Sequence, residues 1–420
     1  MNILDVEYEK YKLNNGLQVI LHKEPALPIV SVNLWYHVGS ANEKRGKTGL
    51  AHLFEHMMFQ GSQNVPKEMH FRYIQEAGGI LNGSTNFDRT NYYEKVPSNF
   101  LELALWLEAD RMGYFLPTLT QEKLNNQKDV VKNERLERYD NQPYGLAWEI
   151  LLEHLFPKIH PYSWPTIGSV NDIKSYTLED VSDFFSTYYT PPNASLVIAG
   201  DFDTIKTKEM IEQYFGSIVQ ATSIVRPVVN PFRISQENII ERRENVQLDR
   251  IYFAWNSETA FGDDDAALDI MSDILSGSKG SRLYKKLVHE LELTQDITVF
   301  QYSGKLAGHL MIVATAKPGV ELDKIKKEIF KELSKLKKNG VTKKELIKTK
   351  NGIRSGFIYS LQNIDSLADQ LNFYNFYLNE PNSFSKDLQR YSDVTNENVK
   401  AAADKYLTAP FVELRITPNK

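Results

Sequence analysis

The feature of this 420-residue sequence that most limits its fold is an internal repeat. A segment that begins at Thr177 reappears at Thr395, and eight or so positions agree without a gap. Every matched pair is 218 residues apart, as Thr177 is from Thr395. Unrelated segments rarely agree in this way, so the repeat indicates a duplication of roughly half the chain. The other matched pairs include Val181/Val399, Tyr188/Tyr406, Thr190/Thr408, Pro192/Pro410, Leu196/Leu414 and Ile198/Ile416.

Each copy of the repeat predicts the same local structure. Thr177 and Thr395 stand where a helix would begin, and a threonine hydroxyl there can accept a hydrogen bond from the first turn. A tyrosine-threonine-proline break follows each predicted helix. Residues 195–199 and 412–417 are rich in β-branched and apolar side chains, which favours a strand after each break.

Both halves also open with predicted strands, at residues 17–22 and 29–38 in the first half and 250–255 in the second. Helical patterns follow these strands, and several connections resemble hairpins. The mixture of strands and helices within each half indicates the α+β class. We therefore predict two homologous α+β domains, each with a mixed, mainly antiparallel sheet packed against helices.

The boundary between the halves is predicted from a change in pattern. Residues 218–241 contain Pro227 and Pro231 and have no helical period, which is typical of a linker. We expect an N-terminal domain over residues 1–217 and a homologous C-terminal domain over residues 242–420.

Composition excludes several classes of function. The chain has no cysteine, which excludes disulfides and thiolate chemistry. Its net charge of −5 argues against nucleic-acid binding, and we interpret the lysine-rich stretch 324–350 as a solvated helix face. No apolar run approaches the ~18–20 residues of a membrane span, and the first ten residues show no signal peptide. We expect a soluble protein of the cytoplasm or periplasm that binds neither nucleic acid nor membrane.

The motif His52-Leu-Phe-Glu55-His56 carries the clearest chemical signal. Thr48 is a plausible N-cap and Gly61 a plausible C-terminal stop, so we predict a helix between them. Histidines four residues apart lie one above the other on a helix, and both rings can reach one ion. The opposite face of this helix has the spacing of a core stripe: Leu50, Leu53, Phe54, Met57 and Met58.

Zinc accepts imidazole nitrogen and carboxylate oxygen, and catalytic zinc sites use three protein ligands and a water molecule. A third donor is available at Glu134, on a helix predicted from Thr120 to about Arg138. Two other interpretations stay open on the residues alone. The histidines could be core residues hydrogen-bonded to Glu55, and Glu134 could be an exposed helix carboxylate.

With Glu134 downstream, the motif resembles the pitrilysin and insulin-degrading-enzyme (insulinase) family of inverted-motif zinc metallopeptidases. The closest branch has chains of about this length that act as two-subunit bacterial and mitochondrial processing-type peptidases. The resemblance extends over most of the chain. It includes Gly16-Leu17-x-Val19, Val38-Gly39-Ser40 with Glu43, Gly49-Leu-Ala-His52, Met58-Phe59-x-Gly61-Ser62, Gly78-Gly79-x-x-Asn82-Gly83-x-Thr85 and Val130-Val131-x-x-Glu134.

The resemblance implies a zinc peptidase in which His52, His56 and Glu134 hold the metal and Glu55 is the general base. Zinc lowers the pKa of its bound water towards ~7, and the base takes the proton of that water and passes it to the leaving amine. The resemblance also suggests that a peptide substrate adds to an exposed edge strand at Leu81-Asn82-Gly83-Ser84 by backbone hydrogen bonds. Ordinary turns at Gly78-Gly79 and Asn82-Gly83 are the alternative.

The sequence departs from the family pattern first beside the third ligand and then in the duplicated half. Many members have a glutamate seven residues before the third ligand, where this chain has Gln127. An amide can still hydrogen-bond a ligand histidine as an outer-shell partner, but it lends the ring less basicity. The duplicated half has no metal motif, because Leu268, Met271 and Ser272 align with the motif residues.

A third departure concerns the second half. Single-chain relatives carry an arginine and a tyrosine there that help to hold the substrate carbonyl, whereas Val288 and Gln295 align with these positions here. We therefore expect a dimer, with a paralogous subunit that lacks the zinc motif or with a second copy, whose chains enclose a chamber. The predicted function is zinc metalloendopeptidase on peptides or unstructured polypeptides. The alternative is a non-catalytic binding or scaffold subunit of the same family.

Overall fold

The computed structural model describes residues 4–219, 224 and 226–419. The chain forms two compact units, which are built from segments that are not contiguous in sequence. Unit 1 comprises Met1–Arg135, Trp164–Pro227 and Phe357–Ser385. Unit 2 comprises Leu136–Ser163, Val228–Gly356 and Lys386–Lys420. The predicted linker, residues 218–241, includes positions 220–223 and 225, which lie outside the described residues.

Unit 1 contains a six-stranded sheet in the order β1-β2-β6-β3-β5-β4. Neighbouring strands are antiparallel except β2 and β6, which are parallel. Strands β3 and β6 are central, and almost all of their residues are buried because helices cover both faces. The strands are β1 (Glu9–Lys12), β2 (Gln18–Lys23), β3 (Ile29–Tyr36), β4 (Ile80–Thr85), β5 (Thr90–Pro97) and β6 (Ala194–Gly200).

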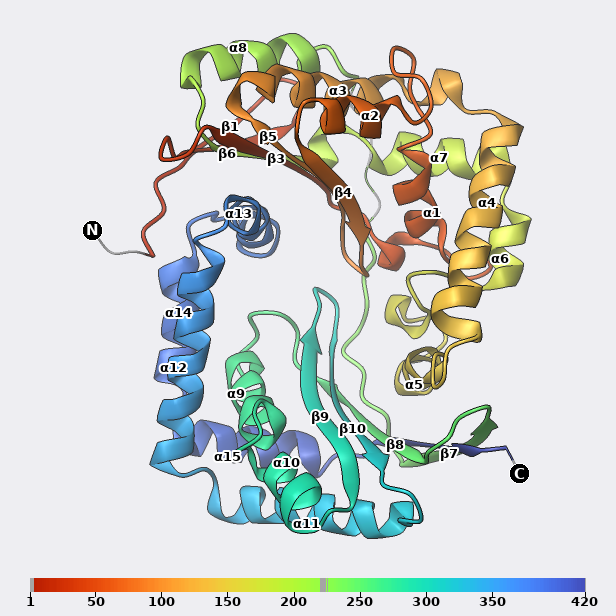
Figure 1. The fold of residues 1–420 in the computed structure, drawn as a ribbon, viewed down its shortest axis with the longest axis vertical. Coiled ribbons are helices and arrows are strands. Elements are labelled where there is room, and N and C mark those ends of the chain that lie inside the picture. Colours follow the sequence, from red (N-terminus) through yellow and green to blue (C-terminus); the bar gives the residue numbers. More distant parts are fainter. Residues whose placement is uncertain (1–3, 220–223, 225, 420) are drawn as a thin grey trace. The chain divides into compact units, whose positions relative to one another are not determined.

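Figure 1 shows α13 on one face of this sheet and α2, α3 and α8 on the other. Helix α13 comes from the C-terminal part of the chain, yet it packs on β3 and β6. Its Asn372 receives a hydrogen bond from the Ser195 hydroxyl and donates one to the Asn33 carbonyl. The helices of unit 1 include α1 (Leu50–Met57), α2 (Met69–Glu76), α3 (Leu101–Tyr114), α4 (Gln121–Arg135), α6 (Val170–Ser175), α7 (Leu178–Tyr188), α8 (Thr204–Phe215) and α13 (Ile364–Leu378).

Unit 2 contains a five-stranded sheet in the order β7-β11-β8-β10-β9. Its core lies between the sheet and helices α9, α11 and α15, with Phe253, Trp255 and Met271 at its centre. The strands are β7 (Asn238–Glu244), β8 (Arg250–Ser257), β9 (Thr294–Ser303), β10 (Gly308–Ala316) and β11 (Val412–Pro418). The helices include α5 (Ala147–Leu155), α9 (Asp265–Ser276), α10 (Arg282–Tyr284), α11 (Leu322–Asn339) and α15 (Asn396–Leu407). Two further helices, α12 (Lys343–Ser360) and α14 (Phe384–Asp393), begin in one unit and end in the other.

The two sheets confirm the predicted duplication. The order β2-β6-β3-β5-β4 of unit 1 recurs as β7-β11-β8-β10-β9 in unit 2, with one parallel pair at the same place. Thr177 and Thr395 both accept a hydrogen bond from the third helical residue and complete a capping box, as the repeat predicts. The fold is therefore α+β, with two domains that have mixed sheets and packed helices.

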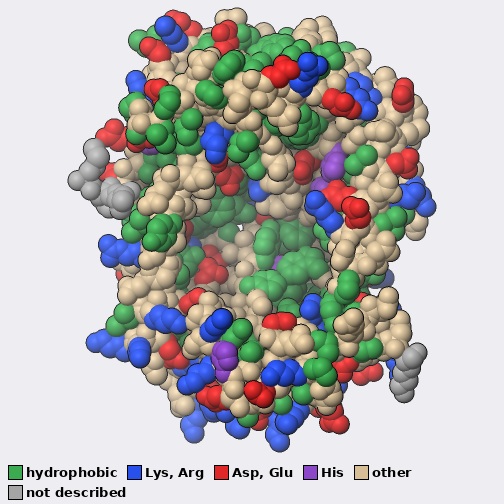
Figure 2. All heavy atoms as spheres, viewed as in Figure 1, with side chains coloured by type: hydrophobic (Ala, Val, Ile, Leu, Met, Phe, Trp, Pro, Cys, Tyr) green, Lys and Arg blue, Asp and Glu red, His purple; other side chains and the backbone are tan. Residues whose placement is uncertain are grey.

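The lysine-rich stretch forms α11 and the start of α12. Leu322, Ile325, Ile329, Leu333 and Leu336 of α11 are buried, and most of its lysines are exposed. Figure 2 shows Lys and Arg side chains gathered over this part of unit 2, in line with the expected solvated helix face. Among the described residues, no helix combines the length and apolar character that crossing a bilayer requires.

Candidate metal centre

Helix α1 presents two different faces, as its sequence predicts. Leu50, Leu53, Phe54 and Met57 are buried in the core of unit 1. His52, Glu55 and His56 lie on the other face and are only partly buried. The rings of His52 and His56 are neighbours, with centroids 4.8 Å apart. The core stripe therefore fixes the direction in which the two imidazoles point.

The start of α1 differs from the prediction. The N-cap is Gly49, with φ of 91°, and an added Cβ would meet Ile167 O at 2.5 Å. Thr48 does not cap α1, because its backbone N–H and its hydroxyl both donate to Asp172. The prediction of Thr48 as N-cap was wrong for this reason.

Glu43 supplies the cap from outside the helix. Its Oε2 accepts the N–H of Gly49 at 2.9 Å, and its Oε1 accepts the N–H of Ala51 at 2.8 Å. The indole of Trp164 also donates to Oε2, at 3.1 Å. Burial raises the pKa of Glu43 to about 8, while these three hydrogen bonds act in the opposite direction. Glu43 thus anchors the first turn of the helix that carries both histidines.

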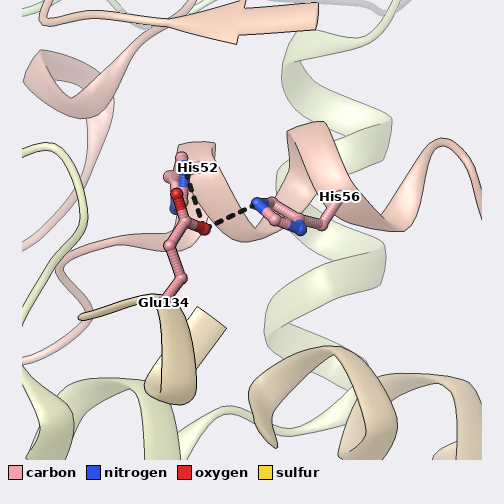
Figure 3. Close-up of side chains that lie close together, drawn as sticks. All are labelled: His52, His56 and Glu134. Carbon is pink, nitrogen blue, oxygen red and sulfur yellow. Dashed lines mark ion pairs between the residues drawn. The ribbon is translucent and has the colours of Figure 1, made fainter. Parts of the chain in front are cut away.

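Glu134 reaches the two histidines from α4. Helix α4 begins after Thr120, whose hydroxyl accepts the N–H of Lys123, as expected of an N-cap. Leu124 and Val131 lie on the buried face of this helix. Figure 3 shows the Glu134 carboxylate directed at both imidazole rings, with dashed lines from one of its oxygens to His52 and to His56. Its Oε2 lies 3.2 Å from His56 Nε2 and 3.7 Å from His52 Nε2. The interpretation of Glu134 as an outward-facing helix carboxylate is therefore wrong.

The three side chains fit a tetrahedral zinc ion by donor type and by spacing. Their possible ligand atoms all lie within 4.8 Å of one another. Ligands at about 2.0–2.1 Å from a tetrahedral metal are about 3.3 Å apart, between the two nitrogen–oxygen separations given above. The side chains are 13–25% exposed, so the group is in partial contact with solvent. Two imidazole nitrogens and one carboxylate oxygen within reach of water match the donor set of a catalytic zinc site.

Glu55 lies on the same helix face and is held by a different partner. The Thr85 hydroxyl donates to its Oε2 at 2.7 Å, and a Cβ at Gly83 would lie 3.1 Å from its Cγ. Burial raises the pKa of Glu55 above its usual range, against the hydrogen bond from Thr85 and the charge of His56, which lower it. A carboxylate with a raised pKa is suited to take and release a proton near neutral pH.

The predicted substrate strand, Leu81 to Ser84, lies within β4 at the edge of the sheet. At the turn that follows β4, the N–H of Asn86 donates to Arg89 O, and the register with β5 continues without a bulge. In an antiparallel ladder, hydrogen-bonded pairs alternate with pairs that are not hydrogen-bonded. Counting from Asn86, the backbone groups of Ser84 and Asn82 are the ones directed at β5. Leu81, Gly83 and Thr85 then direct their backbone N–H and C=O groups towards the outer edge of the sheet, beside Glu55. The N–H of Gly83 donates there to Asn82 Oδ1 at 2.9 Å.

Gln127 also lies on α4 and is 5% exposed. Its side-chain amide donates to Asn126 Oδ1 at 2.9 Å. In unit 2, Leu268, Met271 and Ser272 lie buried on α9, the helix that the repeat aligns with α1. Val288 packs against the core of unit 2, and Gln295 is exposed on β9.

One other group of potential ligands occurs in the described part of the chain: His70, Glu94 and Glu108. All three are buried together with Arg111, which forms ion pairs with both glutamates. The guanidinium already supplies positive charge to these carboxylates, so the group is a buried ion-pair network rather than a second metal site.

Comparison with known proteins places these features in a family. The family profile described as insulinase (peptidase family M16) matches residues 18–161, which include His52, Glu55, His56 and Glu134. The profile described as peptidase M16 inactive domain matches residues 175–353, most of which belong to the half without the motif. The chain belongs to the insulinase (M16) family.

Individual M16 relatives align over almost the whole chain. The zinc protease PqqE of Helicobacter pylori is 29% identical over 408 residues, which are 95% of this chain and 90% of that protein. A probable mitochondrial-processing peptidase subunit beta of Arabidopsis thaliana is 24% identical, over 94% of this chain and 75% of that protein. The crystal structure of a protease from Helicobacter pylori matches with a TM-score of 0.93 and 27% identity, covering 99% of this chain and all of that one.

Two residues beside the candidate metal centre have roles that the sequence motifs do not predict. Thr85 belongs to the strand motif, and its position two residues after Gly83 puts it on the strand face that Glu55 contacts. Glu43 belongs to the motif that precedes the helix. Its signal is a carboxyl group shortly before a helix start, where its oxygens can accept the N–H groups of the first turn.

Proposed function

We propose that the chain is a zinc metalloendopeptidase that acts on peptides or unstructured polypeptides. One observation carries the proposal: Glu134 meets His52 and His56, while the Glu55 carboxylate is held by Thr85. A set of ligands with a separate, nearby carboxylate is what metal-assisted hydrolysis requires. The names of the M16 relatives as zinc proteases give further support.

The proposed mechanism assigns one task to each group. His52, His56 and Glu134 would hold zinc, and the chemistry that zinc supplies when bound is a water of lowered pKa and a polarised carbonyl. Glu55 would take the proton of the attacking water and give it to the leaving amine nitrogen. The edge-facing groups of Leu81 and Gly83 would pair with the peptide backbone, with the peptide taking the Gly83 N–H from the Asn82 side chain, and this selects an extended substrate rather than a particular side chain.

The deciding experiment combines metal analysis with peptide cleavage. The purified chain is expected to contain one zinc and to cleave members of an unstructured peptide library. Glu55→Gln is expected to keep the zinc and to lose about 10²- to 10⁴-fold in turnover, the usual contribution of a general base. A zinc-loaded protein that cleaves nothing, alone or with a paralogue, would support the alternative of a non-catalytic binding subunit. Full activity in Glu55→Gln would contradict the role of Glu55.

We further propose that the active form is a dimer. Support comes from Val288 and Gln295, which cannot supply the charged and aromatic contacts expected at these positions for holding a substrate carbonyl. A paralogous subunit would provide them. The isolated chain is then expected to bind zinc and to cleave slowly, with a large gain in kcat when the paralogue is added. Equal activity with and without the paralogue would contradict a heterodimer.

A further inference from the structure

The hydrogen bond between Thr85 and Glu55 joins two elements that have different tasks in the proposed function. Thr85 is the last residue of β4, and Glu55 lies on α1. The distance from Thr85 Oγ1 to Glu55 Oε2 is 2.7 Å, which is typical of a hydroxyl that donates to a carboxylate. The next hydroxyl, that of Thr90, lies 3.4 Å from Thr85 and donates its own proton to Val38 O at 3.0 Å. Thr85 therefore has Glu55 as its nearest acceptor.

Thr85 is held in place without the help of Glu55. The turn after β4 is closed by the Asn86 side chain, whose Oδ1 accepts the N–H groups of Asp88 and Arg89 at 2.8 and 2.9 Å. The N–H of Ser40 donates to Asn86 O, which fixes the turn to the segment before α1. Arg89 donates to the carbonyl and the hydroxyl of Ser84 from the other face of the strand. The hydroxyl of Thr85 is thus presented from a fixed backbone.

Glu55 needs such a fixed partner. A glutamate side chain has three rotatable bonds, and Gly83 leaves space beside its Cγ. Among the described residues, the bond from Thr85 is the hydrogen bond that the structure gives this carboxylate. Without it, the Glu55 carboxylate would sample several conformers, and only some would face the proposed zinc ligands.

We propose that Thr85 is a positioning residue: it fixes the Glu55 carboxylate, so that the strand that receives the peptide also orients the general base. The proposal rests on the proposed function and adds to it a physical link between the substrate edge and the base. A small displacement of a reacting group can cost a factor of about 100 in rate. The loss should therefore appear in kcat rather than in peptide affinity.

Two variants at this position form a matched pair. Thr85→Val has nearly the same shape and lacks the hydroxyl, whereas Thr85→Ser keeps it. Thr85→Val is expected to lose about 10- to 100-fold in kcat with KM changed less than about twofold, and Thr85→Ser is expected to restore most of the loss. Zinc content and the melting temperature of both variants should match those of the parent protein. Equal kcat in Thr85→Val and the parent, or equal loss in both variants, would overturn the proposal.

A binding readout separates positioning from substrate contact. On a Glu55→Gln background, adding Thr85→Val is expected to leave the affinity for a fluorescent, uncleaved peptide within about twofold. A large loss of affinity there would assign Thr85 to peptide binding and overturn the proposal.

A structural readout is independent of turnover. Crystal structures are expected to show one Glu55 conformer in the parent and Thr85→Ser proteins, and several conformers or a rotated carboxylate in Thr85→Val. An unmoved Glu55 in Thr85→Val would overturn the proposal even if the parent cleaves peptides. Failure of the parent to cleave would instead remove the proposed function and leave this structural result standing.

Discussion

Glu134 of α4 contacts both histidines of the candidate metal centre. Its replacement by glutamine keeps the size of the side chain and removes the negative charge that would attract a cation. We expect Glu134→Gln to weaken zinc binding by more than the roughly 10- to 100-fold that loss of an outer hydrogen-bond partner costs. Zinc competition with a chelator measures the change. Glu137→Gln, one turn further along at an exposed site, is the matched control and should bind zinc like the parent; unaltered affinity in Glu134→Gln would exclude it as a ligand.

Glu345 provides a prediction about acid sensitivity in unit 2. Arg282 donates to both of its oxygens, and Thr342 donates through its N–H and its hydroxyl. The hydrogen bonds from Arg282 are the main cause that lowers the pKa of Glu345 to about 2. A depressed pKa in the folded state stabilises the fold above the ordinary value near 4.5, and this stabilisation disappears as the pH falls towards 2.

The comparison of Glu345→Gln with the parent measures this effect. After allowance for screening at this partly exposed site, the variant should be about 1 kcal/mol less stable at pH 7. The difference in urea unfolding free energy should shrink as the pH falls from 5 to 3. A constant difference over this range would show that the ionised form of Glu345 has no special stabilisation.

At the level of single residues, the sequence predicted which side chains lie together at the candidate metal centre but missed the residues that support them. The two histidines and Glu55 follow from helical spacing, and Glu134 was singled out by its helix and by the resemblance. Thr85 and Glu43 act through hydrogen bonds across a strand and a loop, and no local spacing encodes such contacts. The repeat-derived caps Thr177 and Thr395 were predictable because a capping box is local in sequence.

Among the elements, α1 depends on Glu43, a residue outside the helix, for acceptors at its first turn. Glu43→Ala leaves the N–H groups of Gly49 and Ala51 and the Trp164 indole without this acceptor. Buried donors without partners cost about 1–3 kcal/mol, so the melting temperature should fall and zinc binding should weaken with it.

Glu122→Ala is the control for this prediction, since Glu122 lies in the first turn of α4 but is exposed. Its effect on stability should stay within about 0.5 kcal/mol. Equal melting temperatures in Glu43→Ala and the parent would show that α1 forms without the outside cap.

The predicted elements agree with the structure where the pattern is local, and differ where a distant residue intervenes. The strands at residues 17–22, 29–38 and 250–255 correspond to β2, β3 and β8 within two residues at each end. The helix start at Thr48 was predicted from the residue type alone. Asp172, more than a hundred positions later, takes the Thr48 hydroxyl instead.

For the whole molecule, each compact unit contains a segment from the other half of the sequence, which the repeat does not predict. Residues 357–385 belong to unit 1, and α13 buries Leu371 and Tyr374 there. Asp369 accepts hydrogen bonds from Trp35 and Asn91 on the same face of the sheet. A domain boundary placed by the repeat alone assigns α13 to the second domain, although α13 packs on the sheet of unit 1.

The consequence can be tested with fragments. Residues 1–217 expressed alone should expose the apolar face of β3 and β6, bind a hydrophobic dye and lack a cooperative unfolding transition. Addition of residues 242–420 should restore the transition if the fragments reassemble. A monomeric 1–217 fragment that unfolds cooperatively would contradict this account.

The late position of α13 also matters during synthesis on the ribosome. Helix α13 begins at Ile364, and the last strand of the first sheet ends at Gly200. At bacterial or eukaryotic elongation rates, roughly 10–30 s pass between the emergence of these two elements. During that interval the nascent sheet has one bare apolar side, which is a binding site for chaperones and a hazard for co-translational aggregation.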